Sequence, residues 1–112
     1  MAVSARNIDN AVVLDLTGRF DATAKQDVQH AIDEAMDTGT LHLILNLAGV
    51  PLVDSAALGL LAVNHNKFKE KGGKLSLVNP QPEVRLILDM VAMPKLIPSF
   101  NSIEEALAIV PS

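Results

Sequence analysis

The stretch of sequence that most constrains the fold is LHLILNL, residues 41–47. Successive side chains of an extended chain point to opposite faces, so alternate residues share a face. One face of this stretch carries only leucines: Leu41, Leu43, Leu45 and Leu47. The other face carries His42, Ile44 and Asn46. This alternation is typical of a β-strand, and its high apolar content predicts a central position in a sheet.

Patterns of strand and helix alternate on both sides of this strand. Further strands are predicted at residues 3–8, 11–17 and 74–78, with a short edge strand within 93–100, where two prolines limit pairing. Helices are predicted at residues 23–38 and 55–71, from Pro82 onward, and from Ser102 through Val110. We therefore expect one α/β domain over residues 3–110, with a mixed sheet of about four or five strands flanked by about four helices. The pattern leaves open which face of the sheet each helix covers.

Three local signals mark the ends of these helices. Thr23 with Gln26, and Ser102 with Glu105, have the spacing of a capping box at the first and last helix. The pair Gly72-Gly73 is expected to end the second helix.

The composition excludes several classes of protein. The chain has 112 residues, of which 49% are hydrophobic and 3% aromatic, with no cysteine and a net charge of −4. These values argue against disorder, a disulfide framework and nucleic-acid binding. The most apolar run, residues 50–63, is interrupted by Asp54 and is too short to span a bilayer. We expect a cytoplasmic protein, monomeric or weakly dimeric, with no metal and no cofactor, since His30, His42 and His65 form no ligand cluster in the sequence.

One segment combines a helix start with a potential chemical site: Val53-Asp54-Ser55-Ala56-Ala57-Leu58-Gly59. Either Asp54 or Ser55 is suited to the N-cap position, and a capped helix alone would account for both residues. The same position would also stabilise a phosphate on Ser55, because the first backbone N–H groups of a helix are unpaired and the helix dipole is positive there. Both interpretations remain open on this pattern.

The segment resembles the phosphorylation motif of STAS domains, found in anti-sigma factor antagonists. The resemblance extends to Leu16-Thr17-Gly18-Arg19-Phe20-Asp21, Leu43-Ile44-Leu45-Asn46-Leu47, Lys71-Gly72-Gly73-Lys74-Leu75, Pro82-Glu83-Val84-Arg85-Leu86-Ile87-Leu88 and Ser102-Ile103-Glu104-Glu105-Ala106-Leu107. It implies a regulatory protein-binding module, not an enzyme. The implied partners are an anti-sigma factor that is also a serine kinase acting on Ser55, and a serine phosphatase that resets it.

The resemblance also implies the surroundings of the phosphorylated serine. Asp54 precedes it, Asp21 lies on a turn beside it, and Ala56 and Ala57 replace the second Ser and the Gly of the commonest family motif, Asp-Ser-Ser-Gly-Leu. These two replacements motivate an alternative function: a constitutive STAS subunit of a larger assembly, such as a stressosome or a lipid-transport complex.

Apolar residues continue around the predicted helix after Ser55, so some are expected at the surface. We expect Leu58, Leu60 and Asn64 to bind a partner, with a homodimer contact as the other interpretation. A serine hydrolase is a further alternative, but His65 lies about 15 Å along the helix from Ser55 at 1.5 Å per residue, and no Gly-x-Ser-x-Gly motif surrounds the serine.

Overall fold

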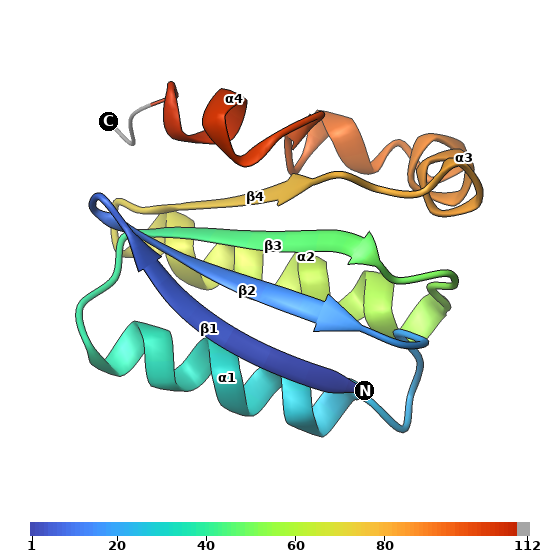
Figure 1. Cartoon of the computed structure of the whole chain (residues 1–112), viewed down its shortest axis with the longest axis horizontal. Helices are drawn as coiled ribbons and strands as arrows, with labels where there is room; N and C mark the ends of the chain where they lie inside the picture. The colour runs from blue at the N-terminus through green and yellow to red at the C-terminus, as the bar shows by residue number, and fades with distance from the viewer. Residues whose placement is uncertain (110–112) are drawn as a thin grey trace.

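The computed structural model describes residues 1–109 and shows a five-stranded sheet flanked by helices (Figure 1). Its strands are β1 (Ala2–Ile8), β2 (Ala11–Thr17), β3 (His42–Gly49), β4 (Lys74–Val78) and β5 (Ser99–Phe100). Its helices are α1 (Lys25–Asp37), α2 (Ser55–Glu70), α3 (Pro82–Met90), the 3₁₀ turn η1 (Met93–Lys95) and α4 (Ile103–Leu107). The predicted mixed α/β architecture is confirmed. Val110, the expected end of the domain and of its last helix, lies outside the described residues, within which α4 ends at Leu107.

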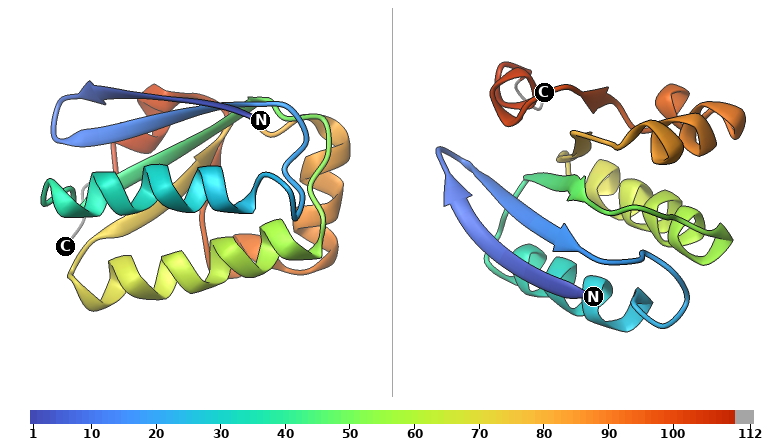
Figure 2. Two further views of the ribbon diagram at one scale, coloured as in Figure 1. Left: turned by 90° about the horizontal axis from the view of Figure 1, so that it is seen from below. Right: turned by 45° about the vertical axis from the view of Figure 1, so that its right-hand side comes forward.

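The strands lie in sequence order, β1-β2-β3-β4-β5. β1 pairs antiparallel to β2 through a tight turn, and every later pair is parallel. Parallel neighbours need crossover connections, which are right-handed in nearly all proteins. Each of β3, β4 and β5 is added on the same side of the strand before it. Right-handed crossovers therefore place the connecting helices on the same face of the sheet. Figure 2 shows α1 and α2 together on one side of the sheet, with α4 on the opposite side.

The predicted central strand is confirmed as β3, which is buried on both faces. Leu43, Leu45 and Leu47 are fully buried in the larger core cluster, with residues of α1, α2 and α3. Ile44 is fully buried in a smaller cluster under α4. The prediction that Leu41 shares the leucine face of the strand is wrong: Leu41 precedes β3 and is 47% exposed. Its carbonyl instead accepts a hydrogen bond from the Lys74 backbone N–H, at the start of β4.

The pair Gly72-Gly73 ends α2 as predicted, but the two glycines act differently. Gly72 has a φ of +76°, a left-handed conformation that favours glycine. Gly73 donates its N–H to the Phe68 carbonyl oxygen at 2.7 Å, and its backbone packs directly against Leu41. A side chain at Gly73 would overlap the Leu41 carbonyl group, so this position allows the close approach of two backbone segments.

A pair of amide side chains, one of them buried, joins α1 to α2. Asn64 of α2 is fully buried, and it exchanges hydrogen bonds with Gln29 of α1 at 2.9 and 2.7 Å. Asn64 also donates to the Leu60 carbonyl oxygen at 2.8 Å. Among residues 1–109 no buried side-chain polar atom lacks a partner, so this pair fixes how α1 sits on α2 without leaving an unpaired group.

In the part of the chain that the structure describes, none of the helices combines the length and the apolar character that crossing a membrane requires.

Replacing Gly73 with alanine is expected to lower the free energy of unfolding by about 1–3 kcal/mol, because the new methyl group must displace backbone at Leu41. Gly59 is the matched control, since a methyl group there meets no atom within 4 Å. Gly59→Ala should stabilise the protein by about 0.5–1 kcal/mol, because alanine costs less backbone entropy in a helix. Urea unfolding followed by circular dichroism measures both, and equal effects of the two changes would contradict the packing argument.

Replacing Asn64 with alanine is expected to cost about 1–3 kcal/mol of stability, because Gln29 loses both of its hydrogen bonds to Asn64. Asn66→Ala, on the exposed side of the same helix, should stay within about 0.5 kcal/mol of the parent protein. The same unfolding measurement compares the two variants. An unchanged midpoint for Asn64→Ala would show that the amide pair does not hold α1 against α2.

Candidate functional site

Two loops at the carboxyl ends of β2 and β3 are held together by backbone hydrogen bonds. Phe20 and Val53 form an isolated parallel bridge, and both side chains are buried. The Phe20 N–H donates to the Leu52 carbonyl oxygen at 2.9 Å, and the Asp54 N–H donates to the Phe20 carbonyl oxygen at 3.3 Å. Asp21, the residue after Phe20, is thereby placed next to the start of α2, as the predicted turn requires.

Asp54, and not Ser55, is the N-cap of α2. Its extended backbone (φ −119°, ψ −174°) precedes the helix, and its carboxylate accepts a hydrogen bond from the Ala57 N–H at 3.1 Å. Ser55 is the first helical residue, its side chain is exposed, and its hydroxyl bonds to none of the residues that the structure describes. The division of roles leaves the Ser55 hydroxyl free at the positive end of a 16-residue helix.

The second acidic residue, Asp21, organises the start of α1. One carboxylate oxygen accepts bonds from the Thr23 hydroxyl at 2.6 Å, the Thr23 N–H at 3.1 Å and the Ala24 N–H at 3.3 Å. The predicted capping box at Thr23 is wrong, because the Thr23 hydroxyl donates to Asp21 and the helix begins only at Lys25. The Thr23 hydroxyl bond, with the Ala24 and Thr23 N–H groups, lowers the pKa of the Asp21 carboxyl.

The two alanines after Ser55 differ in their surroundings. Ala56 is half-buried, whereas Ala57 is fully buried in the larger core cluster. The Ala57 methyl group lies in the core, and the Ala57 N–H donates a hydrogen bond to the Asp54 carboxylate. An alanine in place of glycine at this position leaves the outer surface of the helix unchanged.

Of the three residues predicted to bind a partner, the structure leaves one at the surface. Leu58 is half-buried, but Leu60 is 2% exposed and Asn64 is fully buried, so neither can contact a partner in this conformation. The reason is the helical spacing. The buried stripe of α2 runs through Ala57, Leu60, Leu61, Asn64 and Phe68.

The exposed side of α2 follows Ser55 at the spacing i, i+4, i+8, through Gly59 and Val63. Val63 is 54% exposed, and Leu52, in the loop before α2, is 43% exposed. The predicted partner-binding residues include neither of them, although Val63 belongs to the apolar run after Ser55 of which part was expected at the surface. The helical spacing from Ser55 indicates that Val63 lies on the same side of α2 as the serine. The exposure of Leu52 depends on the loop conformation, which the sequence pattern does not contain.

Histidine chemistry is separate from this site. His42 is buried and its Nε2 lies 3.2 Å from the Ser76 hydroxyl, and burial lowers the pKa of both His42 and His65. Within residues 1–109, no group of three or more His, Asp or Glu side chains is arranged to hold a metal ion. The chemistry that the site offers is a free hydroxyl beside carboxylates.

The lowered pKa of Asp21 predicts how its contribution to stability depends on pH. A carboxyl group with a depressed folded-state pKa stabilises the protein above its ordinary value of 3.8, and this contribution is lost as the pH falls through the lower folded-state value. Asp21→Asn keeps a side chain that can form the same turn but does not titrate.

The difference in unfolding free energy between the parent protein and Asp21→Asn should therefore be constant near pH 7 and shrink below about pH 4. Urea unfolding across this range measures it. Identical pH profiles for the two proteins would mean that the hydrogen bonds around Asp21 do not favour its charged form.

Comparison with known proteins gives consistent results along the whole described chain. The family model of the STAS domain matches residues 2–106. An anti-sigma F factor antagonist from Paenibacillus polymyxa is 27% identical over 97 residues, covering 86% of this chain and 83% of the relative. A crystal structure of an anti-sigma factor antagonist from Mycobacterium paratuberculosis has a TM-score of 0.88 at 21% identity, over 99% of this chain and 94% of that one.

The Bacillus cell fate determinant SpoIIAA in its phosphorylated form has a TM-score of 0.72 at 23% identity, covering 96% of this chain and 97% of that one. At these identities the structural matches show a shared fold. The STAS family model spans nearly the whole chain and shows that this protein belongs to the STAS domain family.

Proposed function

We propose that this protein is an anti-sigma factor antagonist whose binding to an anti-sigma factor is switched by phosphorylation of Ser55. The observation that carries the proposal is the division of roles at the start of α2: Asp54 caps the helix, so the Ser55 hydroxyl is exposed and free to react. The names of the relatives support the class of partner, and SpoIIAA, which shares the fold, exists in a phosphorylated form.

The reaction is a phosphoryl transfer on which this chain acts as substrate. A serine kinase takes the proton from the Ser55 hydroxyl, a bond forms between the serine oxygen and the γ-phosphorus of ATP, and the bond to the β-phosphate oxygen breaks, releasing ADP. The exposure of Ser55 allows a kinase to approach it. A metal-dependent phosphatase would reverse the modification by hydrolysis.

The added group changes the charge at the start of α2. A phosphoserine carries about −1.5 to −2 charges at neutral pH. At the first residue of α2 it is stabilised by the unpaired N–H groups and the helix dipole, while Asp54 and the turn at Asp21 place further negative charge nearby.

The apolar surface beside Ser55 explains why such a charge would release a partner. Leu52 is exposed and Leu58 is half-buried at the start of α2, and Val63 is exposed in the middle of the same helix. A partner that covers these side chains would also remove the phosphate from water. The loss of hydration free energy would weaken binding, because no opposite charge pairs with the buried phosphate. The unphosphorylated protein would therefore bind the anti-sigma factor, and the phosphorylated protein would dissociate, in the cytoplasm where transcription is regulated.

Incubation with ATP and an anti-sigma factor serine kinase encoded in the same genome should add one phosphate, and mass spectrometry should locate it on Ser55. Ser55→Ala should abolish the modification. Ser102→Ala is the matched control, because Ser102 also stands at a helix start but its oxygen accepts the Glu105 N–H at 3.1 Å. Phosphate on Ser102 and none on Ser55 would refute the assignment.

Binding to the same kinase, measured by calorimetry, should be weakened at least tenfold by Ser55→Asp and little affected by Ser55→Ala. The reason is that only the aspartate places a charge on the apolar surface, and a tenfold change requires about 1.4 kcal/mol. Equal affinities would contradict the switch. A stable assembly from the native cell that phosphatase treatment does not alter would favour the constitutive subunit instead.

A further inference from the structure

The outer edge of the sheet at β1 is unpaired. β1 spans seven residues and pairs only with β2, in an uninterrupted antiparallel register from Ala2 to Ile8. Since a strand forms ladder bonds on two sides, the backbone groups of β1 that point away from β2 have no strand to bind. Among residues 1–109, no other backbone segment donates to β1 or accepts from it.

Proteins commonly protect such an edge, and the usual devices are missing here. Prolines, lysines and bulges interrupt edge strands in many sheets, but β1 has the sequence AVSARNI and a continuous register. Its one charged residue, Arg6, does not shield the edge. Its guanidinium lies across the sheet on Asp15 of the neighbouring strand, with bonds of 2.7 and 3.1 Å. The edge is therefore free to accept another strand.

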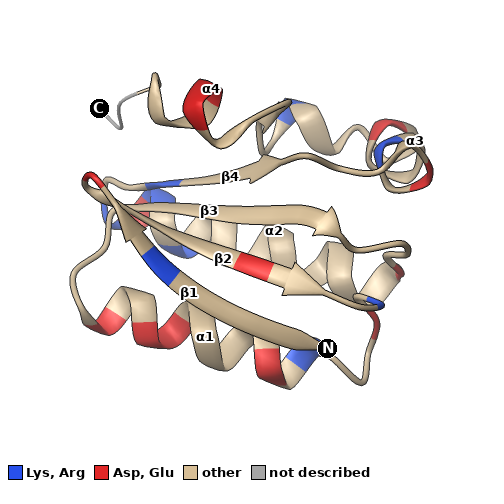
Figure 3. Cartoon of the chain, in the orientation of Figure 1, with Lys and Arg blue, Asp and Glu red and all other residues tan. Residues whose placement is uncertain are grey.

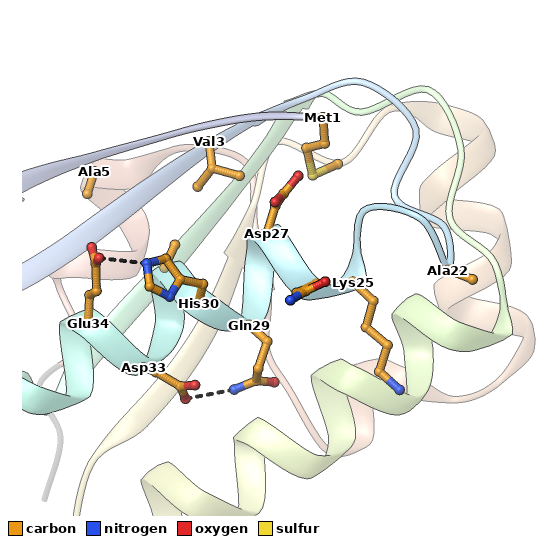
Figure 4. Close-up of a pocket in the computed structure, with 12 residues that line it drawn as sticks. Met1, Val3, Ala5, Ala22, Lys25, Asp27, Gln29, His30, Asp33 and Glu34 are labelled. Atoms are coloured by element: carbon orange, nitrogen blue, oxygen red, sulfur yellow. Dashed lines mark hydrogen bonds and ion pairs between the residues drawn. The ribbon is translucent and has the colours of Figure 1, made fainter.

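A groove of about 1220 Å³ runs along this edge, between β1 and α1. On the β1 side its lining is apolar and small, from Met1, Val3 and Ala5, which alternate along the strand. Figure 4 shows these three side chains directed toward α1. A strand added to β1 would place every second side chain over this groove.

The opposite wall of the groove is acidic. Figure 4 shows Asp27, His30 and Glu34 of α1 on the side facing β1, with His30 Nε2 paired to Glu34 Oε1 at 2.9 Å. Across the whole groove three residues are carboxylates, Asp27, Asp33 and Glu34, and the cationic groups are Lys25 and the Met1 ammonium group. Figure 3 shows this acidic character along α1. A strand lying here is therefore favoured when its groove-facing side chains are basic.

The charge pattern also argues against a second copy of this chain as the occupant. Antiparallel pairing of two β1 strands would bring two acidic α1 faces toward one another. The alternation of β1 directs Arg6 to the other face of the sheet, where it is held by Asp15, so it cannot compensate the carboxylates of a second α1. Like charges close together oppose association.

We propose that the β1 edge and the α1 groove form a second binding site, which accepts an extended, basic segment of a partner protein as an added strand. Main-chain bonds to β1 supply the pairing, and basic side chains at alternate positions reach Asp27 and Glu34. This site includes neither Asp54 nor Ser55. The chain could therefore hold one protein at β1 while Ser55 responds to phosphorylation.

The test uses two acetylated and amidated heptapeptides, TKTVTKT and TETVTET, with the chain carrying no residues before Met1, since Met1 lines the groove. Nuclear magnetic resonance titration and amide hydrogen exchange follow binding. The basic peptide should shift the amide signals of β1 and α1 and slow the exchange of amide protons in β1. The acidic peptide should bind at least tenfold more weakly.

A double variant, Asp27→Lys with Glu34→Lys, should reverse this preference, so that the acidic peptide now binds more tightly. Asp37→Lys with Asp89→Lys makes the same change in net charge on exposed residues outside the groove, and it should keep the preference for the basic peptide. Circular dichroism confirms that both variants fold.

Three results would overturn the proposal: equal binding of the two peptides, signal shifts confined to α2 and the loop before it, or no binding of the basic peptide. Concentration-dependent dimerisation that itself protects the β1 amides would also overturn it, in favour of pairing between two copies. None of these readouts depends on phosphorylation, so the failure of this site and the failure of the Ser55 switch are distinguishable.

Discussion

The backbone bridge between Phe20 and Val53 is the interaction on which the functional end of this molecule depends. It joins the loop after β2 to the loop after β3, and its two hydrogen bonds, to Leu52 and from Asp54, set the distance between the starts of α1 and α2. Asp21 and Asp54 then each satisfy backbone N–H groups at the start of their own helix. Because Asp54 is used in this way, Ser55 is left with a free hydroxyl.

The right-handed crossovers decide which face of the sheet the connecting helices cover. They place α1, α2 and the buried residues of α3 against one face of the sheet, where the leucines of β3 form the larger core. The short α4 covers part of the other face. Among residues 1–109, β1 pairs only with β2, so its other edge has no strand beside it. The same topology thus creates both the end of the sheet that carries Ser55 and the open edge at β1.

The sequence predicted the elements well where one physical signal dominated. Alternation identified β3, Gly72 marked the end of α2, and Ser102 caps α4 as its spacing indicated. The prediction failed where two signals competed. Thr23 has the spacing of a cap, but the nearby Asp21 carboxylate is the stronger acceptor and takes its hydroxyl. Asn64 has a polar side chain, but its position on the stripe of α2 buries it, and Gln29 of α1 makes this possible.

The sequence by itself determined the order of strands and helices and the family resemblance, and it singled out Ser55 as the candidate for phosphorylation. These depend on local periodicity, caps and motifs. Only the tertiary structure decided which side chains around Ser55 reach the surface. Burial depends on how a helix is rotated against the sheet, and contacts between distant residues, such as Asn64 with Gln29, set that rotation. The open β1 edge likewise follows from strand order across the sheet, which no local pattern contains.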